Sequence, residues 1–539
     1  MKSECLPFTQ VPHTTRLFTD FLAYRQEVRR FYPYSPQFTD TLSQQSPNDR
    51  YDAQRRKRVA DILQRQNQAF GASSKTLENI QRFRNGACAA VTGQQVGLFG
   101  GPLFAVFKAL TAVKLAQEAS RAGVECVPIF WLATQDHDLE EVNHTYLPTA
   151  DGLLETLTSS AHGSVGAPVG TIRLGDDISP LVEAAAKLLG ESPITEYLRS
   201  SYRPSETFGS AFARLFARVF ADWGVILLDA DDRELHTIAE PIYRHALERA
   251  AQIDDALLQR GTELESAGYH QQVKVTPSST LLFVMHEGAR TPIHRRLNGN
   301  KEIEFLIGDA KHSQAELLRQ LSSSPEQFSP NVLLRPVVQD YLLPTVAYTG
   351  GAAEVAYFAQ AAVVYENLLE HVTPVLPRFS ATLVEPKAQR LLDRYGLKIT
   401  DCFNGPSPLR EELARRTLPP DLTSAFAKAE RSVDTCWAEI RSALEKLDPT
   451  LVDAAGRAES KVRYQLDHLR ASAARAELRQ SELVERHANV LSNALFPNKA
   501  LQEREIAGVY FLAKYGESLL ADLHGAVHTD CFDHQVIQL

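Results

Sequence analysis

Two short apolar runs, each followed by a polar loop, mark the first third of the chain. Residues 87–91 precede the loop 92–102, and residues 127–133 precede the loop 135–138. Between them, apolar residues recur every three or four positions, as on the buried face of a helix: Leu103, Val106, Phe107, Leu110 and Val113. The pattern predicts a β-loop-α-β-loop unit, whose strands gather polar groups at their carboxyl ends.

The alternation of apolar runs and amphipathic helices continues to about residue 385 and indicates an α/β region. We expect further strands over 224–230, 272–275, 281–285 and 374–380. Residues 150–210 are rich in Gly, Ser and Thr, with weak strand signals over 169–174, and we interpret them as an insertion. A helix is expected to begin near Ala353 and Glu354.

Beyond residue 385 the composition shifts to Ala, Glu, Arg, Leu and Lys. Apolar residues follow a heptad seam: Leu422, Phe426, Ala429, Val433, Cys436, Ile440, Leu444 and Leu447. Pro449 interrupts the seam, and a second helix resumes with Val462, Leu466, Leu469 and Ala473. The pattern predicts an antiparallel helical hairpin, which either packs on its own domain or protrudes as a coiled coil that dimerises.

These patterns divide the chain into four parts. A helical segment, 1–80, is expected to pack on an α/β core, 81–385, which has a parallel sheet and insertions at about 150–210 and 286–328. A helical coiled-coil domain, 386–495, follows, and a tail, 496–539, is expected to dock back on the core.

Composition narrows the classes of function. The 539-residue chain has a formal net charge of −9, which argues against non-specific nucleic-acid binding because that needs a basic surface. No apolar stretch is long enough to span a membrane, and the first residues lack the apolar core of a signal peptide. The six cysteines show no metal-binding spacing, so we expect reduced thiols in a cytoplasmic protein.

The first loop combines glycine and glutamine just before a predicted helix. Its candidate binding residues are Thr92, Gly93, Gln94, Gln95, Gly97 and Gly101. Their spacing matches neither the dinucleotide-binding nor the Walker pattern. Glycine lets a ligand approach the backbone, the helix start favours anions, and Lys108 follows on the helix. The alternative is a tight turn that needs glycine only for positive φ angles.

The second loop carries candidate acid–base groups. His137 beside Asp136 could act as a general base, because a carboxylate partner sets the tautomer of an imidazole. Asp136, His137 and His144 could instead hold a divalent metal, although no established zinc pattern supports that hypothesis. The simplest alternative is a helix N-cap, which we expect of Asp138. Gln135 and Asn143 flank these groups as candidate binding residues.

Two later segments add candidate ligand-binding groups. Arg335 could grip a carboxylate or phosphate through two N–H groups, or form a salt bridge between domains. Residues 348–354 form another glycine turn into a helix start. The candidates here are Arg335, Gln339, Asp340, Tyr341, Tyr348, Gly350, Gly351, Glu354 and Arg378. The cluster of Asp229, Asp231 and Asp232 is expected to cap a helix rather than to catalyse.

Taken together, these segments resemble the bacillithiol biosynthesis cysteine-adding enzymes, a family of cysteine ligases that make a low-molecular-weight thiol. The resemblance runs in order along the full chain. It rests on residues 92–98 with 101–102, 130–138 with 141–144, 334–344, 348–351 with 354–357, 377–380, 496–498 and 501–504.

The resemblance implies a Rossmann-like core with connecting-peptide insertions, similar to class I aminoacyl-tRNA synthetases, and a C-terminal coiled coil that makes a homodimer. The implied reaction joins the carboxyl of L-cysteine to the amine of glucosaminyl malate. Such a condensation needs activation, so ATP with Mg²⁺ is the expected cosubstrate. The chain lacks the HIGH-type and KMSKS-type signatures of the synthetases.

Within this hypothesis, His137, oriented by Asp136, deprotonates the attacking amine, and Asp138 completes the catalytic group. The loop 92–101 and the helix start at 350–354 hold anionic groups, while Arg335 or Arg378 clamps a carboxylate. Two alternatives stay open. One is a metal-assisted amidohydrolase or deacetylase, and the other is a coiled-coil scaffold whose α/β part only binds nucleotide.

Overall fold

The structure is a computed structural model that describes residues 2–42, 47–297, 303–478 and 482–539. Its central element is a five-stranded parallel sheet in the order β13-β12-β2-β3-β6. Its strands are β2 (Cys88–Gln94), β3 (Cys126–Leu132), β6 (Ile226–Asp229), β12 (Thr345–Gly350) and β13 (Val375–Pro377). The β-loop-α-β unit is confirmed, because α5 (Phe104–Arg121) joins β2 to the parallel neighbour β3.

Successive side chains of the central strands enter two different layers. Val91 and Ile129 pack in a core with α3 (Ala53–Phe70), α4 (Ser74–Arg84), α10 (Arg233–Glu248), α13 (Arg335–Leu342) and α14 (Ala352–Leu368). Phe130 and Leu132 pack in the opposite core with α5 and α9 (Phe208–Val219). Because helices cover both faces, the strands are buried throughout, which explains their continuous apolar sequence.

Side-chain amides close the exposed edge of this sheet at β6. Asn67 of α3, fully buried, donates to the carbonyl of Leu227 (2.8 Å) and accepts from its N–H (3.0 Å). Gln66 makes the same pair of bonds with the backbone of Asp229, both at 3.0 Å. The helix therefore takes the place of a sixth strand, and the edge is not free to pair with another chain.

A second, antiparallel sheet has the order β10-β9-β8-β7-β11. Its strands are β7 (Ser279–His286), β8 (Ala289–Leu297), β9 (Ile303–Ile307), β10 (Ala310–His312) and β11 (Phe328–Pro330). It packs against α10, α11 (Ala250–Ser266) and α12 (Gln314–Ser323). The strand expected over 281–285 is confirmed as part of β7.

Other parts of the α/β region differ from the sequence prediction. The expected strand over 272–275 is wrong, because this segment is irregular and its Val273 backbone bonds the buried side chain of Gln360 at both N–H and carbonyl. The expected strand signal over 169–174 is a 3-10 turn. Residues 150–210 contain helices α7 (Ile178–Leu189) and α8 (Pro193–Ser201), which bury apolar faces against the α5 layer.

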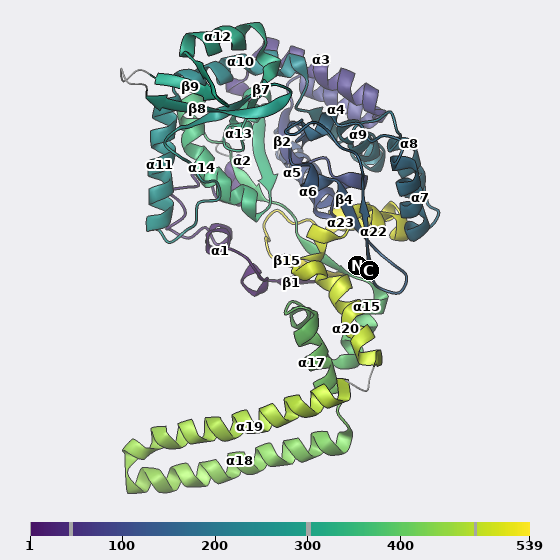
Figure 1. Ribbon diagram of the computed structural model, residues 1–539, viewed down its shortest axis with the longest axis vertical. Coiled ribbons are helices and arrows are strands. Elements are labelled where there is room, and N and C mark those ends of the chain that lie inside the picture. The colour runs from purple at the N-terminus through teal and green to yellow at the C-terminus, as the bar shows by residue number, and fades with distance from the viewer. Residues whose placement is uncertain (1, 43–46, 298–302, 479–481) are drawn as a thin grey trace.

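The two ends of the described chain meet in a third sheet. Strand β15 (His534–Gln538) lies between β1 (Lys2–Leu6), to which it is antiparallel, and β14 (Ala381–Val384), to which it is parallel. The N and C labels therefore lie close together in Figure 1. Helices α22 (Gly508–Tyr515) and α23 (Ser518–Ala526) pack on α5, so the tail contacts the layer of the core that contains α5.

Two long antiparallel helices, α18 (Pro420–Leu447) and α19 (Val452–Leu478), form the expected hairpin. The hairpin extends away from the rest of the molecule, which it meets near α17 (Pro406–Arg416) and α20 (Glu482–Leu495) (Figure 1). Its apolar residues Ile440, Val462 and Leu469 are exposed. In the described ranges, no helix combines the length and apolar character needed to cross a membrane.

The amide closure of β6 gives a first prediction. Replacement of Asn67 by Leu leaves the buried N–H and carbonyl of Leu227 without partners, which should lower the free energy of unfolding by about 2–4 kcal/mol. Chemical denaturation measures the change. The matched control is Gln68→Leu on the exposed side of the same helix, expected within about 0.5 kcal/mol of the parent protein. Equal stability of the two variants would show that the edge bonds contribute nothing.

Candidate active site

A cavity of about 610 Å³ lies at the carboxyl ends of the central strands. It is lined by the ends of β2 and β3, the start of α14, the sheet that contains β7, and the tail. This is the edge at which open parallel sheets bind ligands. Its charged lining residues are Lys108, Asp136, Glu141, Arg290, Arg335, Glu354, Arg378 and Arg504.

Lys108 is the most enclosed charge in this cavity. Lys108 belongs to α5, and its side chain is buried (3% exposed). Its Nζ forms an ion pair with Glu354 Oε2 at 2.7 Å. It also donates to the Gly93 carbonyl and to Gln94 Oε1, both at 2.8 Å. Burial lowers the pKa of Lys108 to about 8, against the opposing effect of Glu354. The cavity therefore holds an ammonium group that titrates near neutral pH.

Glu354 joins the start of α14 to the two central strands. Its carboxylate accepts from Gly351 N (2.7 Å) and from the Tyr348 hydroxyl, as well as from Lys108. Burial alone would raise the pKa of Glu354, but Lys108 and these donors hold it below its usual range. The close approach needs glycine, because a Cβ on Gly350 would lie 2.7 Å from the Glu354 Cβ. The start of α14, predicted as a place for an anionic ligand, is thus occupied by the carboxylate of Glu354 from the same helix.

Arg335 lines the same end of the cavity from the first turn of α13. It donates to Gln339 Oε1 and to the Tyr357 hydroxyl, both at 3.0 Å, and lies over the Tyr348 ring at 5.3 Å. Among the described residues, no carboxylate lies within ion-pair distance of it. The guanidinium therefore keeps charge available for an anionic ligand.

Two further arginines border the cavity beside the Phe104 ring. Arg378 lies 5.2 Å and Arg504 lies 6.0 Å from the ring centroid. Arg378 is held by Glu503, which is fully buried, at 2.6 Å, whereas the structure pairs Arg504 with no carboxylate in the described chain. Glu503 also accepts from Ser380 Oγ and Ala381 N. The tail thus reaches the site and orients one of its cations.

The opposite end of the cavity is acidic. Gln95 Nε2 donates to Asp136 Oδ2 (2.6 Å) and to Glu141 Oε2 (2.8 Å), so it bridges the two carboxylates. Asp136 also accepts from the backbone N–H of His137 through its other oxygen, at 2.7 Å. Both carboxylates line the cavity. The bond from Gln95 to Asp136 therefore brings the two predicted loops into contact at the cavity wall.

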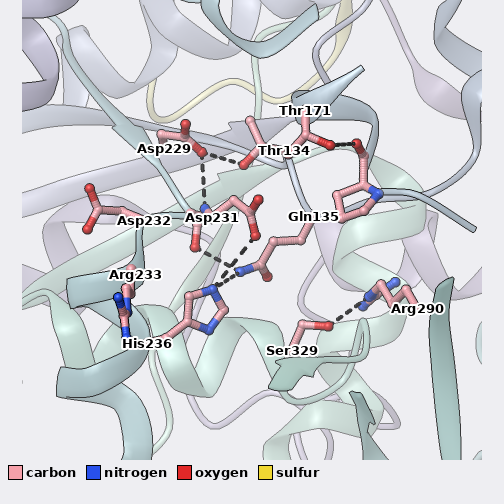
Figure 2. A network of polar contacts seen from close by, with 12 residues as sticks. Thr134, Gln135, Thr171, Asp229, Asp231, Asp232, Arg233, His236, Arg290 and Ser329 are labelled. Carbon is pink, nitrogen blue, oxygen red and sulfur yellow. Dashed lines mark hydrogen bonds and ion pairs between the residues drawn. The ribbon is translucent and has the colours of Figure 1, made fainter. Parts of the chain in front are cut away.

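Figure 2 shows the polar network around Gln135, which involves Thr134, Asp229, Asp231 and His236. Gln135 Nε2 lies 2.8 Å from the Ala230 carbonyl and 2.9 Å from His236 Nε2, a buried imidazole. Asp229 accepts from Thr134 Oγ1 (2.5 Å), and burial raises the pKa of this carboxyl. Asp232 caps α10 by accepting from Glu234 N, so the capping interpretation is confirmed for that residue.

His137 lies beside the cavity rather than on its wall. Its side chain is 46% exposed, and its Nδ1 faces Arg290 Nη1 at 3.4 Å and Asp136 Oδ1 at 3.7 Å. Arginine can only donate, so the Nδ1 lone pair is directed at Arg290. Arg290 itself donates to Ser329 Oγ and the Pro330 carbonyl, and it stacks on the Phe283 ring at 3.9 Å. This environment engages Nδ1 of His137 and leaves the half-exposed ring outside the lining of the cavity.

The structure places the rest of the second loop outside the cavity. Asp138 caps α6 (Leu139–Val142) by accepting from Glu141 N, which confirms the N-cap interpretation. Asn143 is the C-cap of that helix. His144 is the first residue of β4 (His144–Pro148), and its Nδ1 lies 3.1 Å from the Glu140 carbonyl oxygen. Within the described ranges, no three His, Cys, Asp or Glu side chains gather as metal ligands. The metal hypothesis therefore lacks a ligand cluster.

Half of the glycine loop serves packing instead of binding. Thr92 is fully buried and donates to the Thr349 carbonyl, which ties β2 to β12. Gly97 packs on Gly101, where a Cβ would lie 3.0 Å from the Gly101 Cα. Gly93, Gln94 and Gln95 do line the cavity. The tight-turn alternative describes the far part of the loop, and the binding hypothesis fits only its beginning.

Of the candidates that follow Arg335, Gln339 accepts from Arg335 beside the first cavity, whereas Asp340 and Tyr341 face another part of the molecule. Gln339 is fully buried, and Asp340 accepts from the Tyr365 hydroxyl at 2.6 Å. Asp340 and Tyr341 line a separate cavity of about 370 Å³ at the opposite edge of the sheet, near the start of β12. A helix of eight residues explains this separation, because its two ends reach opposite edges.

Several lining residues escaped the sequence prediction. Lys108 lies within an apolar helical stripe, which gave it no signal beyond its proximity to the glycine loop. Glu141 follows the second loop by three residues. Arg290, Tyr357 and Arg504 come from the antiparallel sheet, the middle of α14 and the tail, and nothing in the local sequence links them to the two loops.

The fold and the cavity define a Rossmann-like α/β protein with a C-terminal coiled coil. Residues 1–379 match the family model described as "Bacillithiol biosynthesis BshC, N-terminal Rossmann-like domain". Residues 381–539 match the model of the C-terminal coiled-coil domain of the same family. The chain belongs to the BshC family, which confirms the resemblance and the predicted fold class.

Relatives from several bacteria agree over the full chain. The chain is 49% identical over 539 residues, all of both proteins, to the "Putative cysteine ligase BshC" of Koribacter versatilis. It is 35% identical, again over all of both chains, to the protein of that name from Solibacter usitatus. With the Salinibacter ruber protein it shares 33% identity over 97% of this chain and 96% of the relative.

The titration of Lys108 gives a second prediction. The positive charge is present below pH about 8 and is lost above it, so an anion should bind more weakly at high pH. Malate, a dicarboxylate that is fully ionised from pH 7 upward, should lose about three- to tenfold in affinity between pH 7 and 9.5, measured by calorimetry.

The control removes both members of the buried ion pair, as Lys108→Met with Glu354→Gln, so that no charge is left buried without a partner. Its malate affinity should be weaker and should change little with pH. An unchanged affinity of the parent protein between the two pH values would contradict the role of Lys108.

Proposed function

We propose that this protein is a cysteine ligase that joins the carboxyl of L-cysteine to the amine of glucosaminyl malate. The observation that carries the proposal is the division of one cavity into a cationic end and an acidic end. Lys108, Arg335, Arg378 and Arg504 line the cationic end, where Glu354, the one carboxylate among the described residues there, is paired with Lys108. Asp136 and Glu141 line the acidic end, where Arg290 is the lining cation. Membership of the BshC family and the names of its relatives support the same reaction class.

A substrate with two carboxylates and one amine matches this division of charge. In the proposal, the malate carboxylates lie at the end with Arg335 and Arg504, whose guanidinium groups carry no carboxylate partner in the described chain. Arginine suits this task because its planar fork matches a carboxylate. The amine then lies near Asp136 and Glu141, where a positive charge is favoured.

The proton balance points to Asp136 as the acceptor. The bound ammonium gives one proton to the Asp136 carboxylate, and the freed nitrogen lone pair attacks the activated carboxyl carbon of cysteine. The carbon–nitrogen bond forms, and the leaving group departs with the electron pair of its carbon–oxygen bond. The second proton passes from the nitrogen to the departing oxygen. We assign the proton acceptor to Asp136 and not to His137, because His137 directs Nδ1 at Arg290 and does not line the cavity.

We propose further that ATP with Mg²⁺ activates the carboxyl group. A carboxylate and an amine do not condense in water without a leaving group. The cations that line the cavity fit a phosphate-bearing cosubstrate. The carboxylates of Asp136 and Glu141 are oxygen ligands of the kind that bind Mg²⁺ together with phosphate oxygens.

We also propose that two copies of the chain associate through the α18–α19 hairpin, in the cytoplasm. The hairpin exposes apolar side chains on both helices, including Ile440 at 41% and Leu469 at 60%. Ion pairs hold its two helices together, among them Arg441 with Glu459 and Arg463 with Asp434. Exposed apolar residues at heptad spacing on a stable hairpin are typical of a coiled-coil interface.

The reaction itself is tested with purified protein, glucosaminyl malate, L-cysteine and Mg²⁺, with and without ATP. Mass spectrometry should detect the amide product only with ATP. Replacement of Asp136 by Asn should lower the turnover number at least about 100-fold, because it removes the proton acceptor, whereas His137→Ala should keep most of the activity.

The reverse order of these two variants would return the general base to His137. Absence of product from the folded parent protein under every condition would contradict the ligase proposal. Product without ATP would contradict the proposed activation by ATP. The proposal that cysteine is joined to the amine of glucosaminyl malate would still stand.

Dimer formation is tested by replacing Val462 and Leu469 with Glu. These residues lie seven positions apart on one face of α19 and are 39% and 60% exposed. Sedimentation should show a dimer for the parent protein and a folded monomer for the double variant. Gln465→Glu, an exposed polar position on the same helix, is the matched control and should remain dimeric. A double variant that stays dimeric would place the interface elsewhere.

A further inference from the structure

Three glutamine side chains line the cavity, and their partners fix which way each amide faces. Gln94, Gln95 and Gln135 each combine a carbonyl oxygen, which only accepts, with an NH₂ group, which only donates. A lysine ammonium can only donate, whereas carboxylate and backbone carbonyl oxygens can only accept. The amide orientations therefore follow from the chemistry of the neighbours.

Gln94 belongs to the cationic end. Lys108 Nζ donates to Gln94 Oε1 at 2.8 Å, so the carbonyl oxygen of this amide is engaged. The NH₂ group of Gln94 remains for a ligand, and among the described residues nothing accepts from it. This glutamine therefore adds hydrogen-bond donors to the end that already carries the cations.

Gln95 is oriented the other way. Its Nε2 gives both hydrogens to carboxylates, one to Asp136 Oδ2 at 2.6 Å and one to Glu141 Oε2 at 2.8 Å. The opposite orientation would place a carbonyl oxygen against two negative charges. Its Oε1 is therefore the free atom, and no described residue donates to it.

Gln135 repeats this arrangement on the next strand end (Figure 2). One Nε2 hydrogen goes to the Ala230 carbonyl at 2.8 Å, which leaves the other for His236 Nε2 at 2.9 Å. His236 must then accept at Nε2 and carry its proton on Nδ1, which faces the Tyr243 hydroxyl at 3.4 Å. Gln135 Oε1 remains as a second free acceptor on the cavity wall.

We propose that Gln95 Oε1, Gln135 Oε1 and the carboxylates of Asp136 and Glu141 form a subsite for a primary amine. This inference rests on the proposed function and names the part of the site that selects the amine. An ammonium group has three donors and a positive charge, which match neutral acceptors beside two carboxylates. Arg290, a lining cation whose charge acts on Asp136, is directed at Ser329, Pro330 and His137.

The subsite distinguishes an amine from its closest analogues. A hydroxyl at the same carbon has one donor and no charge, and an N-acetylated amine has one donor, no charge and added bulk. Because a hydrogen bond to a charged group contributes more than a neutral one, the free amine should bind at least about tenfold more tightly than either analogue. The cationic end contributes equally to all three ligands.

Calorimetry with the full-length protein tests the inference without turnover. The probes are glucosaminyl malate, its N-acetylated form, the glucosyl analogue with a hydroxyl in place of the amine, and malate alone. Gln135→Met removes one acceptor at similar length, and Gln94→Met is the matched control at the opposite end. Gln135→Met should reduce the preference for the amine at least about fivefold and leave malate affinity unchanged. Gln94→Met should keep the preference.

The outcomes separate this inference from the ligase proposal. A parent protein that binds all three sugar ligands equally, or none of them, overturns the amine subsite even if amide product forms. A strong preference for the amine supports the subsite even if no product forms. Should Gln135→Met fail to fold by circular dichroism, the comparison of ligands on the parent protein still decides. Loss of the preference in Gln94→Met and its retention in Gln135→Met would overturn the assignment.

Discussion

The buried ion pair of Lys108 with Glu354 is the constraint on which the site depends. Burying two charges costs free energy unless each is paired and hydrogen-bonded. Here Lys108 also donates to the Gly93 carbonyl and Gln94, and Glu354 accepts further hydrogen bonds from other groups at the cavity. Lys108 also holds the end of β2 through the Gly93 carbonyl, and Glu354 holds the turn that follows β12 through Gly351 N. The pair therefore fixes the spacing of two strand ends, and the cavity between them follows from it.

The polarity of the cavity grows from the same pair. Lys108 turns the amide of Gln94 toward itself, while the carboxylates of Asp136 and Glu141 turn Gln95, the next residue, the opposite way. Two adjacent glutamines at one strand end thus present opposite faces to a ligand. The cavity wall therefore separates a hydrogen-bond donor from an acceptor over two adjacent residues.

The sequence allowed four of the five central strands, the two loops and the hairpin to be predicted, because each depends on local pattern. Strand β12 was not predicted, since only a glycine turn was expected at its end. The segment 272–275 shows where this fails. It has strand-like residues, but the side chain of Gln360 satisfies the Val273 backbone that a neighbouring strand would otherwise pair. Lys108 gave no signal beyond its proximity to the glycine loop, because α5 is apolar around it. Arg290 and Arg504 reach the cavity by long-range folding, which no local pattern records.

The tail explains why the chain must close on itself before the site is complete. Arg378 depends on Glu503, which lies 125 residues further along the chain and is itself held by Ser380 Oγ. His534 contacts the same Ser380 hydroxyl from β15, and burial lowers its pKa to about 4, so it stays neutral beside the ion pair. In the sequence, the α18–α19 hairpin lies between Arg378 and Glu503. Its length and its exposed seam can therefore change without moving the groups that line the cavity, whereas the strand pairing of β14 with β15 cannot.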